Sequence, residues 1–149
     1  FSNVDQIWQD ASFLSLVNQN DRIYGRDEEW IQILGIGSEL KQDFHFEESF
    51  QGIEENHFTI VLLHEPDAIR EIEDKTVQLA LAGHSHANQI AIAYIEKLFM
   101  ADNAKEFYKG SYSLGETTLY VNSGIGTSYQ QKLRLLNPPT INFYRIVKK

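Results

Sequence analysis

The sequence contains no cysteine, and this absence excludes two kinds of site. Disulfide bridges and thiolate metal centres cannot form, so any transition-metal site must use His, Asp, Glu or Asn side chains. Proline is also scarce, with three residues, two of which are adjacent at Pro138 and Pro139. Proline therefore interrupts regular secondary structure at few places.

Long apolar runs are missing as well. No stretch reaches the about eighteen apolar residues of a membrane-spanning helix, and no basic segment followed by an apolar one marks a signal peptide. We expect the chain to be soluble as given. It begins with Phe1 rather than methionine, which suggests a processed or truncated product, so the parent protein could be cytoplasmic, or membrane-anchored or exported through an upstream segment.

Basic residues are outnumbered, with 13 Lys and Arg against 21 Asp and Glu and a formal net charge of -8. A nucleic-acid-binding surface needs a basic stripe over the phosphates, and none is evident. A substrate that carries phosphate remains compatible with this charge, because bound divalent cations can invert the local field.

The 149 residues are 42% apolar, which is enough to bury the core of one domain. We find no internal repeat, low-complexity tract or linker, and we assign residues 1–149 to one domain. The apolar spacing from Asn3 to Asp10 predicts a short amphipathic helix. Strand-like runs at Phe13–Val17, Arg22–Tyr24 and Trp30–Ile36, separated by turn-rich segments, predict an antiparallel meander.

The middle of the chain alternates helical and apolar segments. Phe46, Phe50 and Ile53 share a helical face within Phe46–Glu54. Phe58–Leu63 is a continuous apolar run and Val77–Ala82 is a short apolar strand, and both are typical of strands that are buried on both faces. A helix is predicted between them, over Ala68–Lys75.

The second half of the chain is less regular. Asn88–Tyr108 has mixed periodicity, and we place a strand first, near Ile90 to Tyr94, followed by an irregular excursion. Tyr108–Leu114 and Thr117–Asn122 flank Gly115-Glu116, which is a hairpin signal. A last strand, Thr140–Val147, is predicted after the two prolines.

Three histidines follow the two buried strands. His64 comes directly after the first, and Gly83-His84-Ser85-His86 follows the second. Neutral imidazole is a good ligand for zinc, iron or manganese. If the strands are neighbours, His64, His84 and His86 face one cleft, whereas histidines satisfied by backbone carbonyls are the structural alternative. His45 and His57 lie in polar loops and are expected elsewhere.

Two further features have competing interpretations. Ser123–Ser128 is rich in small residues and could offer backbone N–H groups to a phosphate, although a tight turn after a strand is the favoured interpretation. Arg134 could contact a phosphate, but a solvated arginine at a strand end is favoured.

The segments Ile60–Asp67 and Leu79–His86 resemble the last two motifs of the calcineurin-like metallophosphoesterases. The similarity continues through Gln89-Ile90 and Leu119–Ser128, and Trp30–Gly37 and Pro139–Tyr144 also resemble a bacterial subgroup of predicted phosphohydrolases. The subgroup usually has two glycines where this chain has Ala87-Asn88. This departure leaves the histidines intact but changes their surroundings.

The resemblance implies the C-terminal half of a four-layer α/β/β/α sandwich, an α/β fold with a mixed sheet and flanking helices. It implies a hydrolase that cleaves phosphomonoesters or phosphodiesters with a binuclear site of two divalent ions (Mn, Fe, Zn or Mg). His64 and His84 would bind one ion and His86 the other. The aspartates, asparagine and catalytic histidine of the family would lie upstream, so no catalytic residue is assigned and this chain alone is expected to be inactive.

The implied substrate is a phosphate ester, either a small molecule or a lipid-linked compound. Its binding residues are unassigned. The apolar strands need a second cover, which we expect to be the N-terminal half of the same protein or a second copy in a homodimer. Two alternatives remain open: a mononuclear histidine site completed by Glu65 or Asp67, and a non-catalytic interaction module that keeps the fold.

Overall fold

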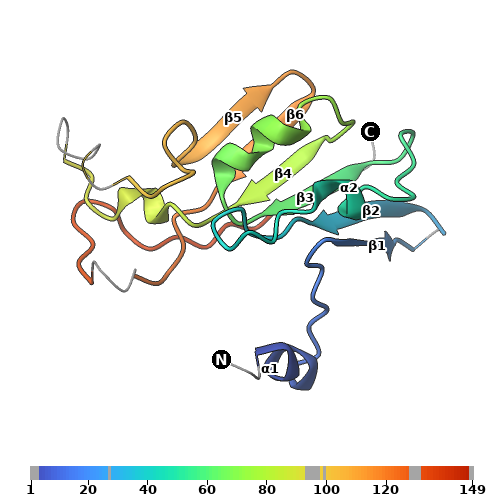
Figure 1. Cartoon of the computed structure of the whole chain (residues 1–149), viewed down its shortest axis with the longest axis horizontal. Helices are drawn as coiled ribbons and strands as arrows, with labels where there is room; N and C mark the ends of the chain where they lie inside the picture. The colour runs from blue at the N-terminus through green and yellow to red at the C-terminus, as the bar shows by residue number, and fades with distance from the viewer. Residues whose placement is uncertain (1–3, 27, 93–97, 99, 128–131, 148–149) are drawn as a thin grey trace.

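The computed structural model describes residues 4–26, 28–92, 98, 100–127 and 132–147. Its centre is one six-stranded sheet in the order β1-β2-β3-β4-β6-β5 (Figure 1). The strands are β1 (Gln19–Tyr24), β2 (Trp30–Gly35), β3 (Thr59–Leu63), β4 (Leu79–Ala82), β5 (Gly110–Leu114) and β6 (Thr117–Val121). Strands β2, β3, β4 and β6 run parallel, and the two edge strands are antiparallel to their neighbours. The mixed sheet confirms the predicted α/β class.

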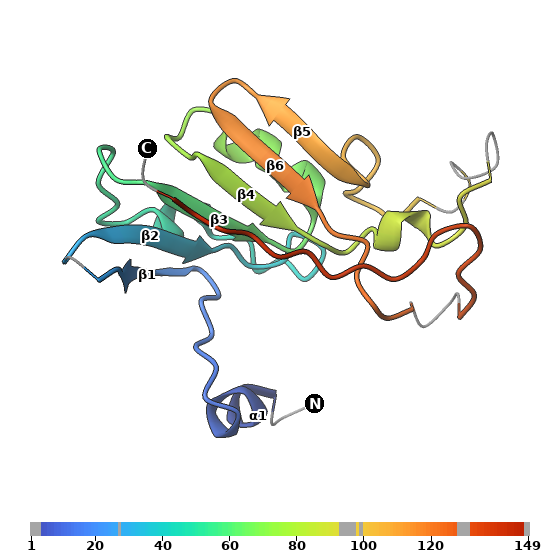
Figure 2. The same cartoon turned by 180° about the vertical axis from the view of Figure 1, so that it is seen from behind.

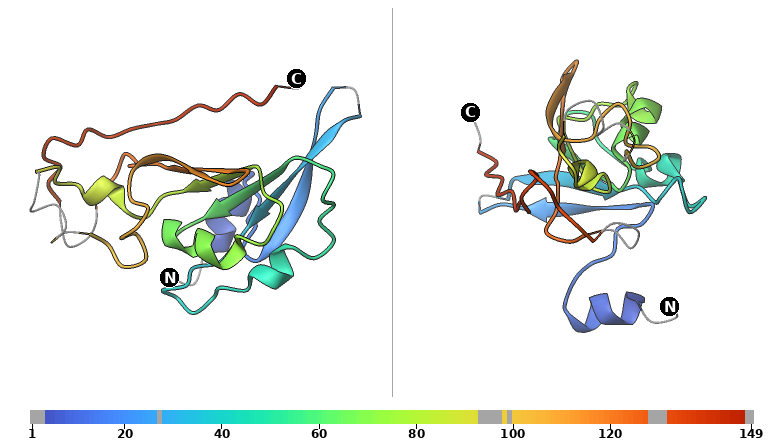
Figure 3. Two further views of the ribbon diagram at one scale, coloured as in Figure 1. Left: turned by 90° about the horizontal axis from the view of Figure 1, so that it is seen from above. Right: turned by 90° about the vertical axis from the view of Figure 1, so that its left-hand side faces the viewer.

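The helices are short. They are α1 (Val4–Asp10), α2 (Phe46–Ser49) and two 3-10 helices, η1 (Pro66–Ile72) and η2 (His86–Asn88). Helices α2 and η1 cover the same face of the sheet, and the C-terminal residues 138–147 run across the opposite face (Figure 3, left). Among the described residues no helix is long and apolar enough to cross a membrane.

The core lies between the sheet and η1. Side chains from one face of the central strands are buried against η1 and the loop that carries Phe107. The main contributors are Leu34, Val61, Leu63, Ala80, Leu119, Val121, Ile69, Ile72 and Phe107. Phe46, Phe50 and Ile53 pack partly buried against this cluster, although only Phe46 lies within α2. Strands β3 and β4, which the three histidines follow, are therefore at the centre of the fold.

Several predicted elements differ from the structure. The helix predicted over Ala68–Lys75 is the 3-10 helix η1, which begins earlier, at Pro66, and the one over Phe46–Glu54 ends at Ser49. Phe13–Val17 forms no strand, because this segment leads away from the sheet to α1 and only Val17 bridges to Gly35 (Figure 1).

The second half of the chain contains two further corrections. Near Ile90 there is a single parallel bridge to Leu135 instead of a strand, and residues 93–97 lie outside the described ones. Thr140–Val147 is extended but joins no ladder, because it crosses the back of the sheet rather than lying along an edge (Figure 2). The predicted hairpin at Gly115-Glu116 is confirmed by the antiparallel pairing of β5 and β6.

Candidate metal centre

His64 and His84 come together because the strands that precede them are parallel neighbours. Strand β3 pairs with β4 in the register Leu63 to Ala82, so both strands end at the same edge of the sheet. The ring centroids of the two histidines lie 4.8 Å apart, with 53° between the ring planes. The structure thus places two of the three predicted ligands side by side.

The proton positions on His84 follow from its hydrogen bond. Its Nε2 atom lies 2.9 Å from the backbone carbonyl oxygen of Asp102. A carbonyl oxygen can only accept, so Nε2 carries the hydrogen and the lone pair of the neutral ring is on Nδ1. In metal sites a bond of this kind from the far ring nitrogen to a carbonyl commonly fixes the tautomer and orientation of a ligand histidine.

The surroundings of His64 favour its neutral form. Its pKa is lowered, chiefly because desolvation disfavours the charged ring, and the neighbouring His84, Lys41 and His86 lower it further. The carboxylate of Glu65 acts in the opposite direction but does not reverse the shift. A neutral imidazole keeps a lone pair free for a cation.

His86 lies two residues further on, in a backbone of unusual conformation. His84, His86, Ala87, Asn88 and Gln89 all have φ between 48° and 62°. Non-glycine residues adopt this left-handed region at a cost of about 1 kcal/mol or more each, and such strain is concentrated at functional sites.

The side chains of Asn137 and Ser85 hold this strained backbone. The amide of Asn137 donates to the carbonyl oxygens of His86 and Ala87, at 2.8 and 2.9 Å. The hydroxyl of Ser85 donates to the carbonyl of Tyr108 and accepts from the N–H of Ala87. Within this network the Nδ1 atom of His86 is buried without a hydrogen-bond partner.

The two carboxylates that follow His64 have other partners. Glu65 is 1% exposed and accepts from the hydroxyl of Ser38 at 2.6 Å. Asp67 accepts from the backbone N–H groups of Lys105, Glu106 and Phe107. In the described part of the chain no group of three or more His, Asp or Glu side chains is placed to hold a metal ion. The mononuclear alternative, which needs Glu65 or Asp67 as a ligand, thus has no support in these contacts.

Two other predicted features can now be placed. Arg134 is not a solvated strand-end residue, because its guanidinium donates to the carbonyl oxygens of Ser123, Gly124 and Gly126. In the loop from Ser123, three backbone carbonyl oxygens thus point toward the guanidinium of Arg134, which gives no support to the alternative of N–H groups offered to a phosphate. The sequence pattern of small residues carries no signal for such an arrangement.

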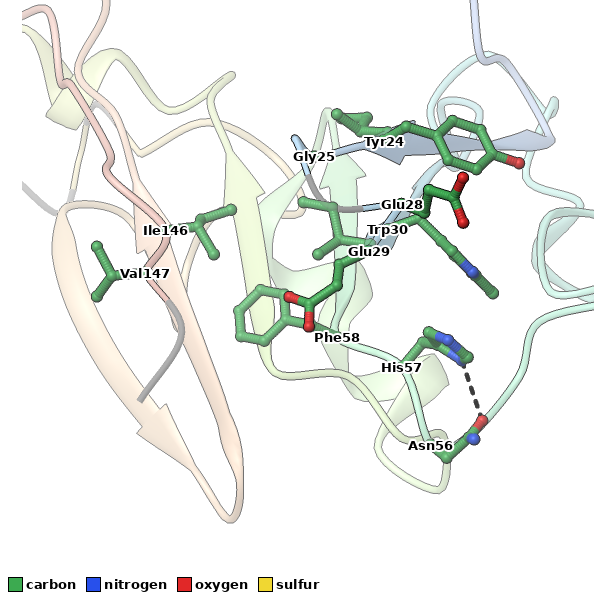
Figure 4. Close-up of a pocket in the computed structure, with 12 residues that line it drawn as sticks. Tyr24, Gly25, Glu28, Glu29, Trp30, Asn56, His57, Phe58, Ile146 and Val147 are labelled. Carbon is green, nitrogen blue, oxygen red and sulfur yellow. Dashed lines mark hydrogen bonds between the residues drawn. The ribbon is translucent and has the colours of Figure 1, made fainter.

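A cavity of about 780 Å³ lies away from His64, His84 and His86, none of which lines it. It is lined by Tyr24, Trp30, His57, Phe58 and Ile146, among others, and His57 stacks on Trp30 at 3.6 Å (Figure 4). Phe58 precedes β3 whereas His64 follows it, which separates the two places by roughly 17 Å of strand. His45 precedes α2, with its Nε2 3.9 Å from an oxygen of Asp43. The cavity is thus distinct from the candidate metal centre.

Comparison with known proteins yields several relatives. The chain is 30% identical over 116 residues to the metallophosphoesterase YkuE of Bacillus subtilis, covering 78% of this chain and 40% of that protein. It is 30% identical over 124 residues to the UDP-2,3-diacylglucosamine pyrophosphatase LpxG of Chlamydia trachomatis, covering 77% and 37%. It is 30% identical over 88 residues to the phosphodiesterase YaeI of Escherichia coli, covering 59% and 32%.

The chain therefore spans two fifths or less of these curated relatives. No family model matches it, and no solved structure matches it. The relatives are named as enzymes that act on phosphate esters or pyrophosphates, which places the chain in a hydrolase family whose name implies dependence on divalent metal. On the similarity to several such proteins, this chain belongs to the metallophosphoesterase family.

Proposed function

We propose that this chain is the C-terminal part of a calcineurin-like metallophosphoesterase domain, and that the whole protein hydrolyses a phosphomonoester or phosphodiester at a two-metal site. The observation that carries the proposal is the contact between His64 and His84 at the ends of β3 and β4. Relatives named as a phosphodiesterase and a pyrophosphatase support the reaction class.

The donor set fits a metal centre. His64 and His84 would hold one divalent cation and His86 the other, as the family resemblance implies. Nδ1 of His84 has a free lone pair, and Nδ1 of His86 is buried without a partner, so both atoms are suited to binding a cation. Two bound cations would supply Lewis acidity toward a phosphoryl group and help to activate a water molecule.

The residues of this chain contribute positioning. Asp102 fixes the ring of His84 through its carbonyl oxygen, and Asn137 fixes the backbone of His86. Glu65 ties the turn after β3 to the loop after β2 through Ser38. Imidazoles held in this way need little reorganisation when a cation binds.

The proposed fold of the whole domain is the four-layer α/β/β/α sandwich. Helices α2 and η1 would form one outer layer, and the sheet described here the layer beneath it. The opposite face of the sheet would pack on a second sheet from the N-terminal half of the same protein, or on a second copy of the chain. The substrate class would be a phosphate-ester small molecule or a lipid-linked compound, like that in the name of LpxG.

The test is alanine substitution in the whole protein that contains this chain. His64→Ala, His84→Ala and His86→Ala should each lower bound manganese and reduce turnover of a chromogenic phosphodiester by about 100-fold or more, because each removes a proposed metal ligand. His57→Ala, at the other end of the sheet, is the matched control and should change neither quantity.

Two results would contradict the proposal. One is full metal content and turnover in the His84→Ala protein. The other is robust, metal-dependent turnover by residues 1–149 alone, because the proposal assigns the bridging carboxylate to the missing part of the domain.

A further inference from the structure

Buried polar side-chain atoms without hydrogen-bond partners gather in one part of the described structure. They are Nδ1 of His86, Nδ2 and Oδ1 of Asn88, and Nη1 of Arg134. A buried polar atom without a partner costs about 1–3 kcal/mol, so folded proteins seldom leave several close together unless a ligand or water supplies the missing bonds.

The segments that carry these atoms lie side by side. Ile90 and Leu135 form a parallel bridge, in which the N–H of Leu135 donates to the carbonyl of Gln89 at 2.8 Å. The N–H of Ala91 donates back to the carbonyl of Leu135 at 2.9 Å. The bonds of Asn137 to His86 and Ala87 continue the contact. Asn88 directly precedes Gln89, and Arg134 directly precedes Leu135, which is hydrogen-bonded to Gln89. Asn88 and Arg134 therefore lie on neighbouring segments of backbone.

Arg134 has the chemistry of an anion-binding residue. Its Nε and Nη2 atoms are bound to loop carbonyls at distances from 2.6 to 3.2 Å, which fixes the plane of the guanidinium. Its Nη1 atom has no partner, and among the described residues no acidic side chain forms an ion pair with Arg134. A fixed guanidinium with one unpartnered nitrogen can donate a single charge-assisted hydrogen bond to a phosphoryl oxygen.

Asn88 complements this cation with a neutral amide. Its side chain is 2% exposed, and neither its nitrogen nor its oxygen has a partner. Asparagine tolerates a φ of 62°, which the backbone has at this position, better than most other residues. The amide nitrogen can donate to an anionic oxygen, and the amide oxygen can accept from a hydroxyl group.

We propose that Asn88 and Arg134 form a binding site for the phosphoryl group of the substrate, beside His86. The inference rests on the proposed function and names residues that the metal site does not use. The ligand would be a phosphate monoester or diester whose anionic oxygens receive hydrogen bonds from Nη1 of Arg134 and Nδ2 of Asn88. Any hydroxyl or protonated oxygen on the substrate could donate to Oδ1.

The experiment measures the affinity of the whole, manganese-loaded protein for inorganic phosphate, by calorimetry and by inhibition of turnover. Asn88→Gly removes the amide without straining the backbone, because glycine accepts a positive φ. It should weaken phosphate binding about tenfold, which is the loss expected for a hydrogen bond to a charged group. Metal content and thermal stability should not fall.

Ala87→Gly is the matched control, since Ala87 has a φ of 48° and its side chain carries no polar group. It should bind phosphate like the wild-type protein. Equal weakening in both glycine variants would assign the effect to backbone flexibility and overturn the proposal, as would wild-type affinity in Asn88→Gly.

Arg134 gives a second, independent measurement. Arg134→Lys keeps the charge but loses the fork of donors, and Arg134→Gln loses both, so phosphate affinity should fall in that order. Arg22→Gln, on the exposed edge strand β1, is the charge-matched control.

If the whole protein has no turnover but Asn88→Gly and Arg134→Gln still weaken phosphate binding, the proposed function fails while this site stands. If the whole protein turns over substrate but these variants keep wild-type phosphate affinity, this site fails while the proposed function stands.

Discussion

A single hydrogen bond decides which nitrogen of His84 can bind a cation. The carbonyl oxygen of Asp102 lies 2.9 Å from Nε2, so Nδ1 is the free donor atom. The left-handed φ of 61° at this residue turns the side chain at the end of β4, directly after Gly83. The sequence pattern alone indicates a ligand histidine but contains nothing that selects one nitrogen, because the acceptor is a backbone atom 18 residues away.

Two amide substitutions can test which nitrogen is used. An asparagine side chain places its oxygen near the position of Nδ1, and a glutamine side chain places it near Nε2. In the whole protein we therefore expect His84→Asn to retain manganese better than His84→Gln, with a dissociation constant lower by about tenfold or more. Metal titration followed by mass spectrometry or calorimetry measures both constants. A tighter site in the glutamine variant would mean that Asp102 does not set the tautomer.

At the scale of elements, the apolar runs were sufficient to locate the central strands. The apolar runs Phe58–Leu63 and Val77–Ala82 each contain a buried parallel strand that is followed by a histidine. Local sequence was insufficient to predict whether an extended segment finds a neighbouring strand to pair with. Thr140–Val147 has strand-like composition, yet no strand of the described sheet lies beside it, so it stays extended and unpaired.

The same reasoning explains which residues near the site the sequence could not identify. Asn88 is visible in the sequence only as a departure from the glycines of the subgroup that the chain resembles, and its burial, at 2% exposed, is seen only in the structure. The sequence predicts a solvated Arg134. The prediction was wrong because the acceptors of this side chain are backbone carbonyls of a loop eight to eleven residues away. Long-range hydrogen bonds to the backbone leave no mark in the pattern of side chains.

The β5–β6 hairpin offers a clean test at this scale. Gly115 begins its two-residue turn with a φ of 60°, and a Cβ atom added there would meet no other atom within 4 Å. Gly115→Ala therefore introduces backbone strain without a clash, and should lower the free energy of unfolding by about 1 kcal/mol. Urea unfolding of the whole protein measures the change.

Gly126→Ala is the control for Gly115→Ala. It also adds a methyl group into open space, but φ at Gly126 is not in the left-handed region. No loss of stability is expected there. Equal effects of the two substitutions would show that the turn conformation at Gly115 is not the cause.

The whole molecule has one covered and one poorly covered face. Helix η1 and α2 bury Leu34, Val61 and Leu119 on one side of the sheet. On the other side the extended segment 138–147 runs across the sheet (Figure 2). Its contact with the sheet includes the packing of Tyr144 on Tyr120, with 5.3 Å between ring centroids. In that segment Ile141 is 66% exposed and Phe143 is 93% exposed. Exposed apolar side chains on the segment that covers this face are typical of a surface that packs on another layer.

Residues 1–149 alone are therefore expected to associate in solution rather than remain monomeric. Association would remove apolar side chains such as Phe143 and Ile141 from water, and each apolar side chain buried contributes about 1.5–3 kcal/mol. The formal charge of -8 opposes contact between two copies, so association should strengthen as salt is raised. Sedimentation velocity on the purified chain, at low and at high salt, makes the measurement. A monodisperse species of 17.2 kDa at both salt concentrations, with cooperative unfolding, would show that this face needs no second layer.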